Sequence, residues 1–209
     1  MSLLSVIDIV NTACARIGED PVESLTDDLG GGQSASLIYD ETVDFNLGLQ
    51  PSGFSFAREV RQLSKLTDAE PLTGYAHVYD IPGAYTGLPV FLSDDATDPD
   101  CRFTRYILTG GQVHSDADPL FAMVKFRPDP NRWTGTFKTA TITALAGKLA
   151  YAIASNRGAY SDFMQEAYGT PSEGFRGGQM RVALSEDGFA NPPRRVQVDR
   201  NPLTNAWRS

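Results

Sequence analysis

Residues 132–154 read RWTGTFKTATITALAGKLAYAIA, and this stretch decides the fold because it carries a broad apolar stripe at helical spacing. Its many alanines allow neighbouring helices to approach closely, and Gly147 lies beside the stripe. We therefore expect a long helix at the centre of a helical bundle. The stripe consists of Phe137, Ala140, Ala144, Leu145, Leu149, Ala150 and Ile153.

Further helical segments follow this stretch. The residues from Asn156 to Gly158 predict its end, and residues 160–168 predict another helix. Residues 169–178 are typical of a loop. The segment MRVALS (180–185) is compatible with either a helix or a strand.

Two helices are also predicted near the N-terminus. An apolar stripe over residues 3–17 predicts the first, with Ser2 as its N-cap and Gly18 as its stop. The second runs over 34–49 and ends before Pro51. The next segment, SFAREVRQLSKL (55–66), fits a short third helix or an extended stretch, and we predict the helix.

Between the helical regions the apolar period shortens from 3.6 toward 2. Residues 75–81 alternate as in a strand, and residues 101–116 predict a hairpin that turns at Gly110-Gly111. Residues 120–127 predict a further strand. We expect one small antiparallel sheet within 75–127, with the loop 93–100 as a solvated tip.

The predicted fold class is α+β: mainly an α-helical bundle with an inserted small antiparallel β-sheet and an extended C-terminal arm. The bundle helices occupy 1–70 and 133–189. The β-rich insertion occupies 71–132, and the arm occupies 190–209.

The arm differs in charge from the rest of the chain. Its sequence, ANPPRRVQVDRNPLTNAWRS, has four arginines against one aspartate, a net +3, whereas residues 1–189 carry 14 − 25 = −11. Three prolines and a single aromatic residue, Trp207, leave it too little apolar surface to fold alone. We expect Arg194, Arg195, Arg200 and Trp207 to bind a partner, although a terminal segment without any function fits the same composition.

Composition excludes several classes of protein. No apolar run reaches about eighteen residues, so no membrane span is predicted. The N-terminus has no basic region and meets Asp8 early, which argues against a signal peptide. The acidic balance disfavours broad nucleic-acid binding. Of the two cysteines, Cys14 lies on an apolar stripe and is expected to be buried, and Cys101 forms no zinc pattern with it.

Catalytic motifs are missing from the sequence. His77 and His114 lie in predicted strands, outside any metal-ligand pattern such as H-E-x-x-H. The glycines of 30–32 lack the Lys-Ser/Thr of a phosphate loop and are better read as a hinge. Paired carboxylates such as Asp27-Asp28 stand in loops and indicate no acid/base role. We predict no enzyme, no catalytic residue and no cofactor.

An acidic run at residues 94–100 invites a calcium interpretation. An EF-hand loop that started at Asp94 would need glycine at its sixth position and glutamate at its last. This chain has Pro99 and Arg105 there. We therefore expect a solvated loop and no metal site.

In this order, the predicted elements resemble a known family, the head-to-tail adaptor (connector) proteins of tailed bacteriophages, especially the tail tubular protein A group of short-tailed phages. The likeness covers about residues 3–190, and 83–100 departs from it most. It is carried by VIDIVNTACARIGEDPVESL (6–25), SLIYDETVDFNLGLQPSGFSFA (36–57), GYAHVYDIP (74–82) and the alanine-rich 132–154.

The resemblance implies a structural virion protein of the phage neck, assembled in the host cytoplasm. It implies a ring of about twelve copies below the portal protein, which extends the channel for passing genomic DNA and docks a downstream tail protein. In related adaptors a C-terminal segment grips the portal or a neighbouring subunit. The arm 190–209 occupies that position, and its arginines can pair with carboxylates of a partner.

Two other functions stay open from sequence. The chain fits another tail component, a tube or baseplate protein, although helical flanks argue against a simple tube barrel. A soluble enzyme with an unrecognised site is the more remote alternative. Binding of the arginines to DNA phosphates is a lesser option, because three net charges give only weak, salt-sensitive binding.

Overall fold

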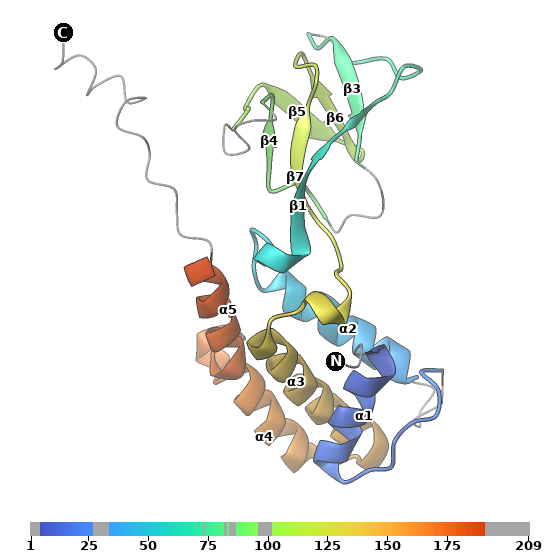
Figure 1. Cartoon of the computed structure of the whole chain (residues 1–209), viewed down its shortest axis with the longest axis vertical. Helices are drawn as coiled ribbons and strands as arrows, with labels where there is room; N and C mark the ends of the chain where they lie inside the picture. The colour runs from blue at the N-terminus through green and yellow to red at the C-terminus, as the bar shows by residue number, and fades with distance from the viewer. Residues whose placement is uncertain are drawn as a thin grey trace, which may run out of the picture.

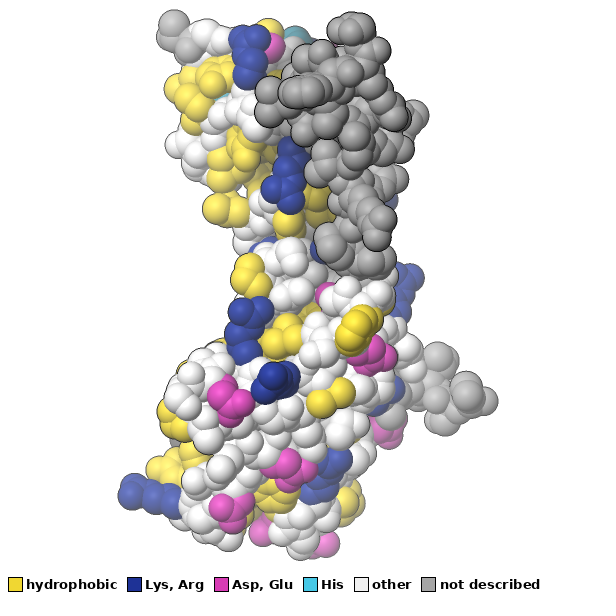
Figure 2. Space-filling view, turned by 90° about the vertical axis from the view of Figure 1, so that its left-hand side faces the viewer, with side chains coloured by type: hydrophobic (Ala, Val, Ile, Leu, Met, Phe, Trp, Pro, Cys, Tyr) yellow, Lys and Arg dark blue, Asp and Glu magenta, His cyan; other side chains and the backbone are white. Residues whose placement is uncertain are grey.

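The molecule has two stacked parts, a helical bundle and a β unit (Figure 1). The computed structural model describes residues 5–26, 34–72, 74–81, 83, 87–95 and 102–190. Within them, strands lie in the chain between the second and third long helices. The α+β prediction, with a β insertion in a helical bundle, is confirmed. Figure 2 shows the narrow waist between the two parts.

The helical bundle is built around one central helix. This helix, α3, contacts each of the other four long helices and buries most of its residues. At Gly147 the helix α4 comes so close that an added Cβ would lie 3.0 Å from Cβ of Phe163. The long helices are α1 (Val6–Ile17), α2 (Ala35–Gly48), α3 (Gly135–Ala154), α4 (Arg157–Tyr168) and α5 (Gly178–Ala190).

The first helix starts three residues later than predicted. Its N-cap is Ser5 rather than Ser2, because Ser5 and Asp8 form a capping box in which the Ser5 N–H donates to the Asp8 carboxylate at 2.8 Å. The predicted stop at Gly18 is confirmed, since this residue adopts a left-handed conformation, φ 77°. The second predicted helix, 34–49, corresponds to α2, for which Ser34 is the N-cap.

The predicted third helix is wrong. Residues 55–57 form one 3-10 turn, η1 (Ser55–Ala57), and the chain then continues as strands β1 (Arg58–Gln62) and β2 (Ser64–Lys65). The extended alternative was the correct one. β1 pairs antiparallel with β7 (Phe121–Lys125), so that Arg58 lies opposite Lys125.

The β unit contains two antiparallel sheets where one was predicted. One has the order β1-β7-β4 and the other β2-β3-β6-β5. The hairpin turn at Gly110-Gly111 is confirmed, because Thr109 pairs with Gln112 across it. The other strands are β3 (His77–Asp80), β4 (Phe91–Ser93), β5 (Tyr106–Thr109) and β6 (Gln112–Ser115).

The predicted solvated loop 93–100 needs a correction at its start. Ser93 ends β4 and is buried, because it pairs with Phe121 in the sheet. Asp94 is exposed, and residues 96–100 lie outside the described residues. The part of the loop that is described therefore belongs to the β unit.

Each part has a hydrophobic core of its own. The bundle core includes Phe54, Phe137 and Tyr168, whereas the smaller β core includes Tyr79 and Leu120. Cys14 lies fully buried in the bundle core, as predicted. Among the described residues no helix has the length and hydropathy of a membrane span.

The chain passes between the two parts at β1 and after β7. At this junction the Phe126 N–H donates to the Ala57 carbonyl at 3.0 Å. A second 3-10 turn, η2 (Pro130–Arg132), leads into α3. Trp133 packs edge-on against Phe137, with its Nε1–H bonded to the Pro128 carbonyl at 3.3 Å. The junction is thus fixed by backbone bonds and aromatic packing.

Candidate interaction site

A short elbow, residues 169–177, joins α4 to α5 and lines a pocket on the surface of the bundle. It contains one 3-10 turn, η3 (Pro171–Glu173). The Glu173 carboxylate accepts hydrogen bonds from the Thr170 N–H at 2.8 Å and the Thr170 hydroxyl at 3.0 Å. The backbone bond and then the hydroxyl bond lower the pKa of Glu173. The Gly177 N–H donates to the Tyr168 carbonyl at 2.9 Å, so a hydrogen bond joins the last residue of the elbow to the last residue of α4.

α5 begins directly against the last turn of α4. Gly178 has φ 52°, and a Cβ there would collide with the Glu166 carbonyl. Only glycine meets both conditions at low cost. The start of α5 is therefore locked beside the elbow.

Phe175 stands out in the elbow because of its backbone. Its φ of 63° lies in the left-handed region, which bulky residues rarely adopt. The ring makes edge contacts with Phe45 of α2, at 5.6 Å between centroids, and with Tyr168 of α4, at 6.0 Å. It is nevertheless 49% exposed. Strained positions of this kind cluster at binding sites, so Phe175 marks a candidate one.

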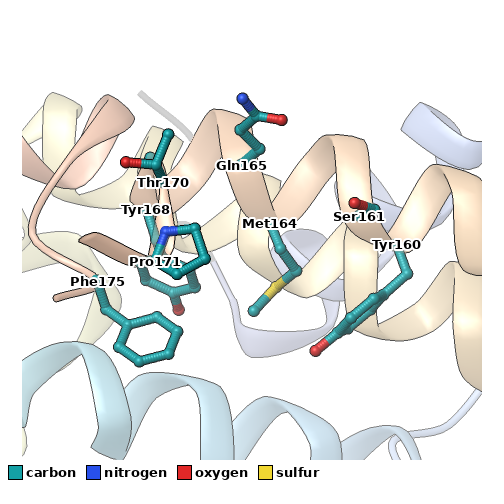
Figure 3. A pocket seen from close by; sticks show the side chains of 9 residues that line it. Tyr160, Ser161, Met164, Gln165, Tyr168, Thr170, Pro171 and Phe175 are labelled. Atoms are coloured by element: carbon teal, nitrogen blue, oxygen red, sulfur yellow. The ribbon is translucent and has the colours of Figure 1, made fainter. Parts of the chain in front are cut away.

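A shallow aromatic pocket of about 300 Å³ opens beside Phe175. In Figure 3, Phe175 and Tyr160 stand at opposite ends, and Met164 projects between them. The side chains of Tyr168 and Pro171 are drawn just above the ring of Phe175 in this view. All the residues that line the aromatic pocket are uncharged. Its volume is at the lower end for ligand sites, which suits a single side chain.

Tyr168 fixes the floor of the aromatic pocket. It is 1% exposed, and its hydroxyl donates to Oδ1 of Asn46 in α2 at 2.5 Å. The Asn46 Nδ2 in turn donates to Oγ1 of Thr141 in α3 at 3.0 Å. Burial raises the pKa of Tyr168, so its phenol stays neutral. These two bonds connect three helices beneath the site.

The predicted contact residues Arg194, Arg195, Arg200 and Trp207 lie outside the described residues. Ala190, with which the predicted arm begins, is the last residue of α5. Phe189 beside it is 85% exposed. At the same end of α5, the Asp187 carboxylate accepts the Ser55 N–H at 2.7 Å, which places this end at the junction with the β unit.

The two histidines lie in the β unit, apart from the aromatic pocket. His77 is on β3 and His114 on the neighbouring β6. His114 is buried, and its Nδ1 accepts the Leu72 N–H at 3.2 Å, which is a structural role. In the described part of the chain no three His, Cys, Asp or Glu side chains gather as metal ligands would.

Sequence reasoning missed the aromatic pocket. One signal was available, since Tyr160, Met164 and Tyr168 recur every four residues along one helix face. Phe175 follows in a glycine-rich loop. Its contact with Phe45 of α2 is not indicated by any pattern in the neighbouring sequence.

The comparisons add no relative from which a function could be transferred. No protein-family model matches the sequence, and no curated protein matches it. Inference about function therefore rests on the chain itself.

Proposed function

We propose that this protein is a head-to-tail adaptor of a tailed bacteriophage, a structural virion protein that forms a ring below the portal. The C-terminal arm binds the portal protein or a neighbouring copy. The opposite face of the ring docks a downstream tail protein, and genomic DNA only passes through the channel. The proposal assigns no catalytic step to the chain.

The position from which the arm leaves the body is the observation that carries this proposal. α5 ends at Ala190, next to the contact between Asp187 and the Ser55 N–H, at the waist of the molecule. An arm rooted at the waist has both the bundle and the β unit beside it. Binding of the arm to another molecule leaves both described cores intact, because they are built from residues that precede Ala190.

Charge supports a protein partner over DNA. The arm carries a net +3 and the remainder of the chain −11. Arginines recognise carboxylates bidentately, so an acidic protein surface, including another copy of this chain, suits the arm. Negative charge on the body disfavours adhesion to DNA phosphates, which suits a wall around a DNA channel.

Exposed hydrophobic side chains on the body are compatible with contacts to neighbouring molecules. Figure 2 shows hydrophobic side chains exposed on both parts, between basic and acidic ones. Among the large ones are Leu37 at 59%, Leu88 at 62% and Val182 at 56% exposure. Apolar residues spread over several elements offer contacts to more than one neighbour, as a ring subunit between two other proteins requires.

The test combines the full-length protein with the purified portal protein of the same virus and images the mixture by electron microscopy. A ring on the tail-facing side of the portal is expected. A triple variant, R194E/R195E/R200E, should weaken the complex at least about tenfold, because charge reversal replaces attraction with repulsion.

The outcomes separate the alternatives. Unchanged binding of the triple variant would remove the arm from the contact. Binding to a tail protein without any binding to portal would favour a tube or baseplate component.

A further inference from the structure

We propose that Trp207 of the C-terminal arm occupies the aromatic pocket of its own chain before any partner binds. The occupant is thus the terminal segment 191–209, and the receptor is the surface between Tyr160 and Phe175. The proposal does not depend on which partner the arm later binds.

The length of the arm fits this intrachain contact. The aromatic pocket lies at the start of α5, because Gly178 packs on the last turn of α4 next to Gly169, which lines it. α5 contains thirteen residues from Gly178 to Ala190, so these two residues lie about 20 Å apart along the helix. A random-coil segment of the same length as the stretch from Ala190 to Trp207 would have a root-mean-square span of about 20–25 Å. Effective concentration is highest when span and distance match in this way.

The aromatic pocket suits an indole ring. Phe175 and Tyr160 present aromatic faces and edges at its two ends, and Met164 adds a polarisable thioether between them (Figure 3). A buried indole also needs an acceptor for its N–H. Ser161 and Gln165, which line the same pocket, supply oxygen atoms for that bond.

The charges near the aromatic pocket favour the same occupant. α4 carries exposed Asp162 and Glu166, each next to a residue that lines it. Arg208 follows Trp207 directly in the sequence. Docking of the indole would bring the Arg208 guanidinium to the same exposed surface of α4, where an ion pair adds little to the binding energy.

The contact gives the arm a resting position. A partner that binds the arginines and the indole more tightly than the aromatic pocket does would displace the arm from the pocket. In the free protein, Trp207, the single aromatic residue of the arm, stays covered. An open tryptophan on a basic segment would otherwise be available to unrelated surfaces.

The experiment measures acrylamide quenching of Trp207 fluorescence in the full-length protein. The second tryptophan, Trp133, is only 5% exposed. The variant Trp207→Phe reports the fluorescence of Trp133 alone, which is subtracted from the signal of the native protein. We expect Trp207 to be protected in the native chain. Phe175→Ser should lower the ratio of docked to free arm at least about tenfold, the usual effect of losing one hot-spot contact.

Two further variants sharpen the test. Phe189→Ser removes a more exposed phenylalanine outside the aromatic pocket and should leave the protection unchanged. Tyr160→Ser removes the other end of the aromatic pocket and should expose Trp207 as Phe175→Ser does, which covers the case in which Phe175→Ser misfolds by circular dichroism. Full quenching of Trp207 in the native protein, or protection that survives both pocket variants, would overturn the proposal. Protection that disappears on roughly hundredfold dilution would show docking between copies and would also overturn it.

Discussion

The phenol of Tyr168 donates a 2.5 Å hydrogen bond to Oδ1 of Asn46, two residues that are 122 positions apart and both buried. The bond connects α4 to α2 beneath the aromatic pocket. Because neither group has access to water, each depends on the other to satisfy its polar atoms. The bond holds the Tyr168 side chain in place where it lines the pocket.

Tyr168→Phe should lower the free energy of unfolding by about 1–3 kcal/mol, because it leaves the buried Asn46 oxygen without this donor. Urea denaturation monitored by circular dichroism measures the change. Tyr160→Phe, at a more exposed tyrosine of the same helix, is the control and should change it by less than about 0.5 kcal/mol. Equal effects of the two substitutions would contradict the assigned role of the buried bond.

Asp187→Ala should loosen the root of the C-terminal arm. The change removes the acceptor of the Ser55 N–H, with an expected cost of about 1–3 kcal/mol. Hydrogen exchange should accelerate most in the last turn of α5 and in η1. Ser185→Ala, at an exposed position two residues earlier in the same helix, is the matched control. Exchange that rises evenly over all helices would argue against a local tie.

Two helix glycines should respond in opposite ways to a larger side chain. Gly147→Leu forces α3 away from Phe163 and should destabilise the bundle by about 1–3 kcal/mol or more. Gly188 has open space around its Cβ position, so Gly188→Ala should stabilise α5 by about 0.5 kcal/mol. Thermal unfolding measures both. Tolerance of leucine at position 147 would show that α3 and α4 are less closely packed than described.

The elbow should make stability sensitive to acid. Hydrogen bonds from Thr170 lower the folded-state pKa of Glu173 below its ordinary value of 4.5. The carboxylate therefore adds stability above pH 4.5, and this addition is lost as the pH falls through the lowered pKa. Glu173→Gln should reduce the melting temperature at pH 7, and the gap to the native protein should narrow below pH 4.5. A gap that stays constant from pH 7 to about 3 would refute the assignment.

Most of the helices were predictable because their signals are local, whereas residues 180–185, which lie in α5, were also compatible with a strand. The stripe from Phe137 to Ile153 depends only on spacing within one segment, and Gly18 stops α1 by its own backbone preference. The Ser5 cap was also available locally, since Asp8 stands three residues after it, but Asp is a less usual partner than Glu in a capping box.

The strand at 58–62 was missed because its partner is distant in sequence. Arg58 pairs with Lys125, and such long-range ladders leave no periodic trace in a charged segment like REVRQ. The division into two sheets follows from the same pairing. Phe175 illustrates the limit for the site, because its contact with Phe45 depends on how α2 and the elbow meet in space.

The paired strands β1 and β7 form both crossings between the helical bundle and the β unit, and they are hydrogen-bonded neighbours. The β unit is therefore attached like a cassette, through two adjacent ends and with a core that is not shared. During evolution such a cassette can diverge, shrink or be exchanged while the helices keep their packing. Mutations in the β unit can therefore change its binding partners without altering the packing of the helical bundle that carries the arm.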